Sequence, residues 1–256
     1  MDISNSKFLV TGGGSGMGRS FTIELARLGA DVTFCDINED AIQAVINETS
    51  DLSGTVYGTV CNVADEEDVN RFVAFGAEKM GGLNGIINNA GIIRDGLLVR
   101  KDRKTGEIKS LSSKKWQQVI DVNLTGVFLG SRAFAEWHIE NGGTDGVIVS
   151  ISSISRHGNQ GQSNYSAAKS GIVSMTALWA GELGRYGIRT GAIAPGFTRT
   201  PILEGMPPEM LERMLKPVPL RRMAEPTEIF QAVRFIIECG YFTGRCIDVD
   251  GGLRLP

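Results

Sequence analysis

The sequence predicts an α/β protein: one doubly wound domain with a mostly parallel, seven-stranded sheet and helices on both faces. Short apolar, β-branched runs alternate with longer amphipathic segments along the whole chain, which is the order expected of βαβ units. A glycine-rich loop directly follows the first apolar run. No internal repeat and no Pro-, Gly- or Ser-rich linker divides the 256 residues. One domain spanning residues 1–256 therefore accounts for the chain.

Each short apolar run has the length and composition of a buried parallel strand. The strands are expected at 8–11, 32–36, 55–61, 85–88, 147–152, 188–194 and 246–249. The segments between them carry apolar residues at the spacing of one helix face. These helices are expected at 17–28, 39–48, 66–80, 116–138, 165–185 and 226–239. In such a sheet, ligands bind at the carboxyl ends of the strands, so the residues just after each strand are the candidates for function.

The composition is that of an ordinary globular protein, with 42% hydrophobic and 21% charged residues. A net charge of −3 and the spread of the basic residues argue against nucleic acid as a partner. The four cysteines form no CxxC pair and only two histidines are present, so no metal site is expected. The N-terminal residues show no signal-peptide pattern, and no apolar run is long enough to span a bilayer. These features predict a soluble, cytoplasmic protein with no membrane partner.

The glycine-rich loop is the segment TGGGSGMG at 11–18. Glycines allow positive φ angles and a close approach of a ligand to the backbone. The N-terminus of the following helix offers free N–H groups to a pyrophosphate. A merely flexible loop is the alternative, but the position between the first strand and the first helix favours nucleotide binding. The spacing is Thr-Gly-x-x-x-Gly-x-Gly, with Gly12, Gly16 and Gly18 in the fixed places.

The second predicted strand ends at Asp36, about 20 residues beyond the loop, where an acidic side chain can bind ribose hydroxyls. The alternative is that Asp36 caps the helix that follows, and both roles are compatible. A carboxylate that faces the ribose repels a 2′-phosphate, and neither Ser15 nor Ile37 supplies a cation in its place. The sequence therefore predicts NAD(H) rather than NADP(H) as cofactor.

The segment NYSAAKSG at 164–171 places Tyr165 and Lys169 four residues apart on one face of a predicted helix. Such a pair by itself is common on solvated helix faces. Further short motifs accompany it, in this order: TGGGSGMG at 11–18, NNAG at 88–91, DVNLTG at 121–126, ISS at 151–153, YSAAK at 165–169, APG at 194–196 and IDVDGG at 247–252. With these motifs the chain resembles the short-chain dehydrogenase/reductase family over nearly its whole length. The resemblance implies a Rossmann-type fold.

The resemblance also implies a catalytic set of Asn123, Ser152, Tyr165 and Lys169. A free tyrosine has a pKa of about 10, and an adjacent ammonium together with a cationic nicotinamide ring favours the phenolate. Ser152 is expected to bind the carbonyl oxygen and to stabilise charge that develops there. Ser153 is the neighbouring alternative, because strand alternation allows only one of the two to face the site. Asn123 either satisfies a kink in its helix or, as in the family, holds a water that relays protons to Lys169.

Cofactor-binding residues are expected, by the same resemblance, after several of the strands. They are Gly12, Ser15, Gly16, Met17, Gly18, Asp36, Ile37, Asn62, Val63, Asn89, Ala90, Gly91, Tyr165, Lys169, Pro195, Gly196, Thr198 and Thr200. Two positions depart from the family pattern. Asn62 stands where the family often has an Asp that contacts adenine, and Asn can still hydrogen-bond the exocyclic amine. Gly191 replaces a common Asn, which concerns local packing more than chemistry.

The segment near 200–222 is rich in Leu and Met at helical spacing and corresponds to the family's substrate lid. A core-facing amphipathic helix is the alternative. Because Met suits an adaptable apolar pocket, Met206 and Met210 are candidate substrate contacts, together with Ser152. His157 is either a solvated loop residue or a further substrate contact.

The loop near 94–113 is longer than is usual in the family. Eight basic residues lie between positions 94 and 115, and the KTGE segment predicts a small hairpin. A solvated surface loop and a contact with an anionic part of the substrate, such as a coenzyme A tail, are the two interpretations. The acidic segment ENGGTDG at 140–146 argues against a carrier-protein partner.

The sequence thus predicts an NAD(H)-dependent oxidoreductase that interconverts a secondary alcohol and a ketone, with Tyr165 as general acid/base. The expected substrate is an apolar or cyclic small molecule. Reduction of a 3-oxoacyl group linked to coenzyme A or to a carrier protein is the alternative. A non-enzymatic nucleotide sensor on this fold would keep the glycine loop and lose the tyrosine. The resemblance further implies a homotetramer, assembled through the helices that begin near residues 116 and 165.

Overall fold

Seven parallel strands form the main sheet of the computed structural model, which describes residues 1–254 apart from the side chain of Ile202. The strand order is β3 (Val56–Val60), β2 (Asp31–Asp36), β1 (Lys7–Thr11), β4 (Gly85–Asn88), β7 (Gly146–Ile151), β8 (Ile188–Pro195) and β9 (Arg245–Val249). All seven predicted strands are present, and their ends differ from the predicted ones by at most one residue.

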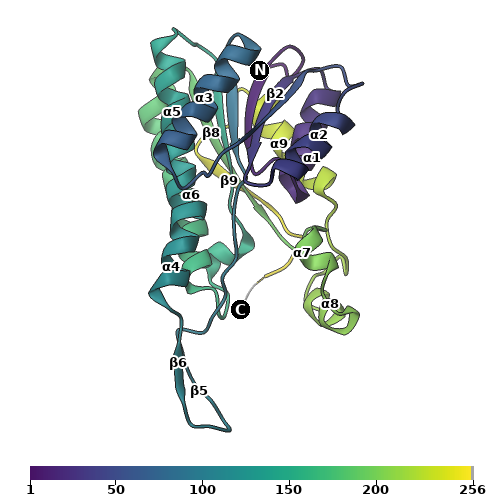
Figure 1. The fold of residues 1–256 in the computed structure, drawn as a ribbon, viewed down its shortest axis with the longest axis vertical. Helices are drawn as coiled ribbons and strands as arrows, with labels where there is room; N and C mark the ends of the chain where they lie inside the picture. Colours follow the sequence, from purple (N-terminus) through teal and green to yellow (C-terminus); the bar gives the residue numbers. More distant parts are fainter. Residues whose placement is uncertain (255–256) are drawn as a thin grey trace.

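Helices cover both faces of this sheet (Figure 1). One face is covered by α1 (Gly16–Arg27), α2 (Glu39–Glu48) and α9 (Pro226–Glu238), and the other by α3 (Glu66–Met80), α5 (Gly126–Glu140) and α6 (Ser163–Leu183). Short 3-10 turns occur at η2 (Ile154–His157) and η3 (Gly184–Tyr186). The predicted doubly wound α/β fold is confirmed. Within residues 1–254, no helix combines the length and the apolar composition needed to cross a membrane.

Neighbouring residues of the central strands point into two different cores. Phe8 and Val10 of β1 pack with α1 and α9, whereas Leu9 between them packs with α3 and α5. In β4, Ile87 belongs to the first core and Ile86 to the second. Burial on both faces explains why these strands have continuous rather than alternating apolar sequences.

The strand order reverses at the centre of the sheet. β1 lies between β2 and β4, and the chain adds β2 and β3 on one side of it before crossing to β4 on the other. A crevice opens at the carboxyl ends of the strands at such a switch point, and this is where ligands bind in open α/β sheets. The strands that surround this crevice end at Thr11, Asp36, Asn88, Ile151 and Pro195.

The single helix predicted for 116–138 is interrupted in the structure. It consists of α4 (Ser113–Ile120), a π-helical turn η1 (Asp121–Thr125) and α5. In this turn the N–H of Gly126 donates to the carbonyl oxygen of Asp121, five residues earlier. Apolar periodicity over the whole segment gives no sign of one inserted residue, so the prediction of a continuous helix was wrong. Such π-turns are frequent at functional sites, and Asn123 lies in this one.

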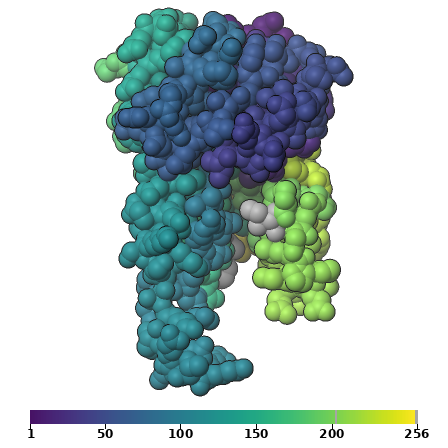
Figure 2. Space-filling view, in the orientation of Figure 1, coloured from purple at the N-terminus to yellow at the C-terminus, as the bar shows by residue number. Residues whose placement is uncertain are grey.

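Two arms extend from the carboxyl edge of the sheet, with a hollow between them (Figure 2). One arm is the predicted hairpin, with strands β5 (Val99–Lys101) and β6 (Ile108–Ser110). The other contains α7 (Pro201–Glu204) and α8 (Pro208–Leu215), in the segment where the sequence predicts a lid.

His138 is buried in the last turn of α5. Its ring lies 5.6 Å from that of Phe134, centroid to centroid. Desolvation lowers the pKa of His138, while the carboxylate of Asp145 and two nearby backbone carbonyls oppose this shift without reversing it. The folded protein therefore disfavours a proton at this site.

We expect the free energy of unfolding to fall as the pH is lowered through about 6.5, the pKa of an unfolded histidine. Below that value the unfolded chain binds a proton that buried His138 does not, and one such proton gives a slope of at most about 1.4 kcal/mol per pH unit. In urea unfolding measured by circular dichroism between about pH 8 and pH 5.5, His138→Leu should remove this part of the slope. The other histidine of the chain, His157, is exposed, so His157→Gln serves as the control. Equal slopes in the wild type and in His138→Leu would contradict the assignment.

Candidate active site

The glycine loop forms a tight cradle between β1 and α1. Gly12 and Gly16 have φ angles of +65° and +53°, which favour glycine. A Cβ atom on Gly12 would lie 2.8 Å from the Cα of Ala90, so a larger residue does not fit there. The side chain of Ser15 makes no capping hydrogen bond at the start of α1, so the first N–H groups of the helix are available to an anion. This geometry fits the pyrophosphate of a dinucleotide.

The end of β4 keeps the loop in place. Asn89 donates from its amide nitrogen to the carbonyl oxygens of Thr11 and Gly12, at 3.1 Å each. The N–H groups of Asn89 and Ala90 both donate to the Thr11 hydroxyl oxygen, also at 3.1 Å. The side chain of Asn89 is therefore bonded to the glycine loop itself. Gly91, two residues later, lies next to Asn123: a Cβ atom added to Gly91 would be 3.5 Å from the Asn123 side-chain oxygen.

Asp36 ends β2 beside the same loop. Its carboxylate accepts from the N–H of Gly14 at 3.0 Å and from the N–H groups of Ile37 and Asn38 at 2.8 and 3.2 Å. The cap of α2 is Asn38, whose side chain accepts from the N–H of Ala41. Asn38 rather than Asp36 therefore caps α2. The carboxylate is placed next to the phosphate cradle.

Asn62 and Val63 follow β3, on the side expected for adenine. The side-chain oxygen of Asn62 accepts from the N–H of Ala64 at 3.1 Å, which leaves its amide nitrogen free of that contact. Val63 is buried. The polar atom that Asn62 can present outward is therefore a donor.

The π-turn brings Asn123 onto the segment after β4. Its fully buried side chain accepts from the N–H of Ile92 at 2.8 Å and donates to the carbonyl oxygen of Ile92 at 2.9 Å. These two bonds use one N–H and one oxygen lone pair of the amide. Asn123 therefore does fix the interruption of its helix, and its place next to Gly91 also puts it at the candidate site.

Lys169 lies one helical turn after Tyr165 on α6, as the spacing predicts. Its side chain is only 3% exposed, and its Nζ donates to the carbonyl oxygen of Ile151 at 2.7 Å. The Nζ lies 5.5 Å from the centroid of the Tyr165 ring. Burial lowers the pKa of Lys169 to about 8. Burial also raises the pKa of Tyr165, and a polar contact with the Ser153 hydroxyl acts in the opposite direction.

The choice of Ser152 as the residue facing the tyrosine is corrected by this geometry. The Ser152 hydroxyl is buried and donates to the backbone carbonyl oxygen of Lys169 at 2.7 Å, while its N–H continues the ladder to Ile193 of β8. Ser153, the neighbouring alternative, lies close enough to Tyr165 for its hydroxyl to lower the pKa of the phenol. Strand alternation allows only one of the two to face the site, and their distance along the chain from Tyr165 does not determine which.

The segment after β8 reaches the glycine loop. Pro195 ends the strand, and Gly196 donates its N–H to the carbonyl oxygen of Val249 at 2.9 Å. Thr198 is buried. The methyl group of Thr200 would lie 3.5 Å from a Cβ placed on Gly16, so this threonine borders the cradle. The segment after β8 thus borders the start of α1 at the carboxyl edge of the sheet.

The proposed substrate contacts are less closely assembled. His157 is exposed at the end of η2, and Met210 is exposed on α8, with Met206 half-buried before it. Arg156 is tied to Asp248 of β9 by an ion pair of 2.6 Å. No hydrogen bond or ion pair of the described residues joins His157, Met206 or Met210 to Tyr165.

Two polar residues near Tyr165 were missed in the sequence. Asn164 is fully buried and donates to the carbonyl oxygens of Arg94 and Lys115, at 3.1 Å each. The charge of Asp95 contributes to the raised pKa of Tyr165. The polar run QSN just before Tyr165 was the only signal.

The fold and this site define a nicotinamide-dependent oxidoreductase. A family model described as Enoyl-(Acyl carrier protein) reductase matches residues 12–254. The chain belongs to the short-chain dehydrogenase/reductase family.

Several known proteins are similar to this chain over nearly its whole length. It is 37% identical to the 3-oxoacyl-(acyl-carrier-protein) reductase FabG of Thermotoga maritima, covering 99% of both chains. It is 33% identical to the (3R)-3-hydroxyacyl-CoA dehydrogenase of Canis lupus familiaris, covering 96% of this chain and 95% of the relative. The crystal structure of levodione reductase superposes with a TM-score of 0.84 at 32% identity, covering 97% of each chain. That of a short-chain type dehydrogenase/reductase from Mycobacterium marinum superposes with a TM-score of 0.88 at 28% identity, covering 100% of this chain and 98% of the other.

The two serines should respond differently to replacement by alanine. We expect Ser153→Ala to lower kcat about a hundredfold, the effect of removing one donor to a developing oxyanion. Ser152→Ala should instead lower stability by about 0.5–1.5 kcal/mol, because one buried hydrogen bond between β7 and α6 is lost. Steady-state kinetics with a ketone that the wild type reduces, combined with urea unfolding of both variants, separates the two effects. The opposite pattern would restore Ser152 to the site.

Proposed function

We propose that the protein interconverts a 3-oxoacyl thioester and the corresponding 3-hydroxyacyl thioester, with NAD(H) as cofactor. The proximity of the buried Lys169 ammonium to the Tyr165 ring, 5.5 Å from Nζ to the centroid, supports an active oxidoreductase rather than a nucleotide sensor. The substrate class is supported by relatives named for 3-oxoacyl and 3-hydroxyacyl groups. This replaces the expectation of a simple apolar or cyclic alcohol as the first choice.

A cyclic ketone is the second candidate substrate. One observation favours it, the similarity to levodione reductase at 32% identity. The half-buried Met206 and the exposed Met210 on the second arm are compatible with an apolar ring. The two candidates share the chemistry of the carbonyl group and differ in what lies beyond it.

Reduction requires a proton at the carbonyl oxygen and a hydride at the carbonyl carbon. The phenol of Tyr165 donates the proton. The Ser153 hydroxyl donates a hydrogen bond to the same oxygen, while one of its lone pairs accepts from the N–H of Ser155 at 3.1 Å and holds the hydroxyl oxygen in place. The ammonium of Lys169 stabilises the phenolate that remains. A bound nicotinamide supplies the hydride, and oxidation reverses these roles.

We assign the cofactor to the residues that border the crevice. The loop from Gly12 to Gly18 would hold the pyrophosphate, and Asp36 the hydroxyls of the adenosine ribose. Asn123 and Lys169 would lie toward the nicotinamide ribose, and Thr200 toward the carboxamide. The other residues proposed to border the cofactor lie at the ends of the same strands or just after them. They are Ile37, Asn62, Val63, Asn89, Ala90, Gly91, Tyr165, Pro195, Gly196 and Thr198.

We also propose a homotetramer that works in the cytoplasm. Trp116, Phe128 and Leu178 are exposed on α4, α5 and α6, and these are the helices through which the family resemblance places the subunit contacts. Large apolar side chains exposed on adjacent helices are typical of surfaces that bind another protein chain.

Turnover of a small thioester tests the reaction. The wild type should reduce the acetoacetyl thioester of N-acetylcysteamine with NADH, followed by loss of NADH absorbance. Tyr165→Phe should lower kcat by about a hundredfold to ten-thousandfold, because the general acid is gone. NADH binding, measured by fluorescence titration, should change little, since the cradle is untouched. Retained turnover in Tyr165→Phe would rule out the acid/base assignment, and a cyclic diketone in place of the thioester tests the second candidate.

Replacement of Asp36 tests the cofactor. In Asp36→Asn we expect kcat/KM with NADH to fall about tenfold, which corresponds to about 1.4 kcal/mol of lost ribose binding. Activity with NADPH should rise relative to NADH, because the charge that repels a 2′-phosphate is removed. Asp40→Asn removes a charge from the first turn of α2 and is the matched control. A wild type that prefers NADPH would show that Asp36 does not bind the ribose.

A further inference from the structure

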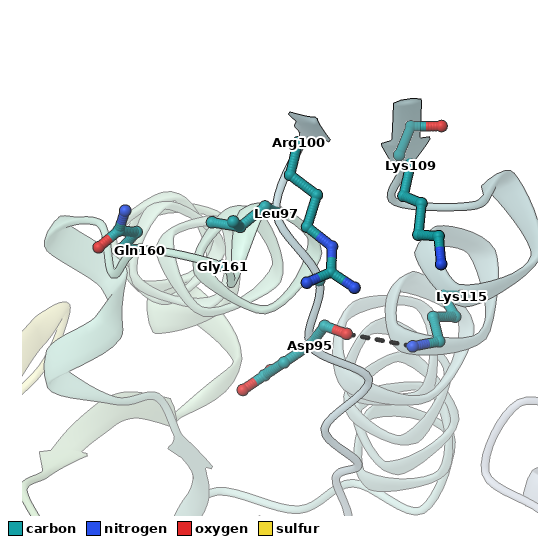
Figure 3. A pocket seen from close by; sticks show the side chains of 9 residues that line it. Asp95, Leu97, Arg100, Lys109, Lys115, Gln160 and Gly161 are labelled. Atoms are coloured by element: carbon teal, nitrogen blue, oxygen red, sulfur yellow. Dashed lines mark hydrogen bonds between the residues drawn. The ribbon is translucent and has the colours of Figure 1, made fainter. Parts of the chain in front are cut away.

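A cationic cavity lies between the β5–β6 hairpin and the loop that precedes Tyr165 (Figure 3). Its volume is about 680 Å³, within the range of small-molecule sites. Arg100 and Lys109 extend into it from the two hairpin strands, and Lys115 borders it from α4. Gln160 and Gly161, in the loop between η2 and α6, border the other side.

Two of these cations are direct neighbours. Arg100 and Lys109 are paired opposite each other in the antiparallel register of the hairpin. Like charges directly opposite destabilise a strand pair, and here the pair belongs to a hairpin with strands of only three residues each. An anion bound between the two side chains would convert this repulsion into attraction.

Three cations and one carboxylate, that of Asp95, line the cavity, so its lining is net positive. Both carboxylate oxygens of Asp95 accept from the side-chain amide of Gln162, at 3.2 and 3.1 Å. Lys115 donates to the backbone carbonyl oxygen of Asp95 at 3.1 Å rather than to its carboxylate. Lys109 has an exposed ion pair with Glu107 at 3.1 Å, of a kind that contributes little. Over the part of the chain that the structure describes, neither Arg100 nor Lys115 forms an ion pair.

The cavity is joined to the segment that carries the tyrosine. The N–H of Gly96 donates to the carbonyl oxygen of Gly161 at 2.8 Å, and Gly96 pairs with Gln162 in an isolated bridge. Asn164, next to Tyr165, is bonded to the backbone at both ends of the hairpin segment, Arg94 and Lys115. The cavity therefore has a fixed position relative to Tyr165, on the arm that flanks the hollow at the carboxyl edge (Figure 2).

We propose that this cavity binds the phosphorylated nucleotide end of a coenzyme A thioester whose acyl carbonyl lies at Tyr165. This rests on the proposed thioester substrate. Coenzyme A carries its phosphates at the far end of an uncharged pantetheine arm, so a site for them must lie apart from the reacting carbonyl. Arginine binds phosphate oxygens in a bidentate manner and lysine supplies further charge. A carrier protein needs a docking surface of about 800 Å² on each partner, whereas a concave site with three cations suits a small anionic group.

The double variant Arg100→Gln/Lys109→Gln tests the cavity kinetically. With acetoacetyl-coenzyme A, KM should rise about tenfold while kcat stays the same, since two charge-assisted contacts to phosphate are lost far from the reacting bond. With the acetoacetyl thioester of N-acetylcysteamine, which has no phosphates, both constants should stay unchanged. Lys101→Gln/Arg103→Gln removes the same charges from the same hairpin outside the cavity lining and is the matched control.

Binding of free coenzyme A gives a readout that does not depend on turnover. Isothermal titration of NAD⁺-saturated protein should show binding that weakens about tenfold in the cavity variant and not in the control. A wild type that reduces the short thioester but gains nothing from the coenzyme A group, in KM or in binding, would overturn this inference and leave the proposed function intact. Binding of coenzyme A without reduction of either thioester would support the cavity and refute the proposed function. If the cavity variant impairs only an acyl-carrier-protein substrate, the cavity is a protein docking site instead.

Discussion

Lys169 is a cation buried almost completely at the carboxyl edge of the sheet, and the arrangement of the site depends on how it is held. Its ammonium donates to Ile151 at the end of β7, while Ser152 donates to its backbone carbonyl. A buried charge without partners is strongly unfavourable, so these bonds keep α6 against the end of β7. The same two bonds position Tyr165, one helical turn before Lys169, and Ser153, the residue after Ser152.

The hairpin segment depends on this arrangement as well. Asn164 is buried next to Tyr165 and satisfies its amide with the backbone of Arg94 and Lys115. The base of the hairpin segment is thus bonded to the first turn of α6, which carries Tyr165. Movement of the hairpin would break hydrogen bonds of a buried side chain, which is costly. For this reason a charge on the hairpin has a defined place relative to the reacting group.

The dinucleotide side of the site is built on a different principle, the absence of side chains. Gly12 packs so closely on Ala90 that no Cβ fits between them. Asn89 and Thr11 then fasten the loop to β4 through side-chain hydrogen bonds. Strand β2, which pairs with β1, ends at Asp36 and brings its carboxylate to the N–H of Gly14 in the same loop. The proposed phosphate and ribose sites therefore lie side by side at the switch point of the sheet.

The sequence by itself determined the order and extent of the strands, because burial on both faces leaves a continuous apolar run that is visible locally. It also determined the glycine loop and the Tyr165–Lys169 pair, since both depend on short spacings. The tertiary structure alone decided that the Ser152 hydroxyl is bonded to the Lys169 carbonyl, that a π-turn interrupts the helix around Asn123, and that cations of the hairpin lie beside the loop before α6. These features rest on contacts between residues far apart in the chain, such as Ser152 with Lys169 and Gly96 with Gly161. Local periodicity carries no information about such contacts.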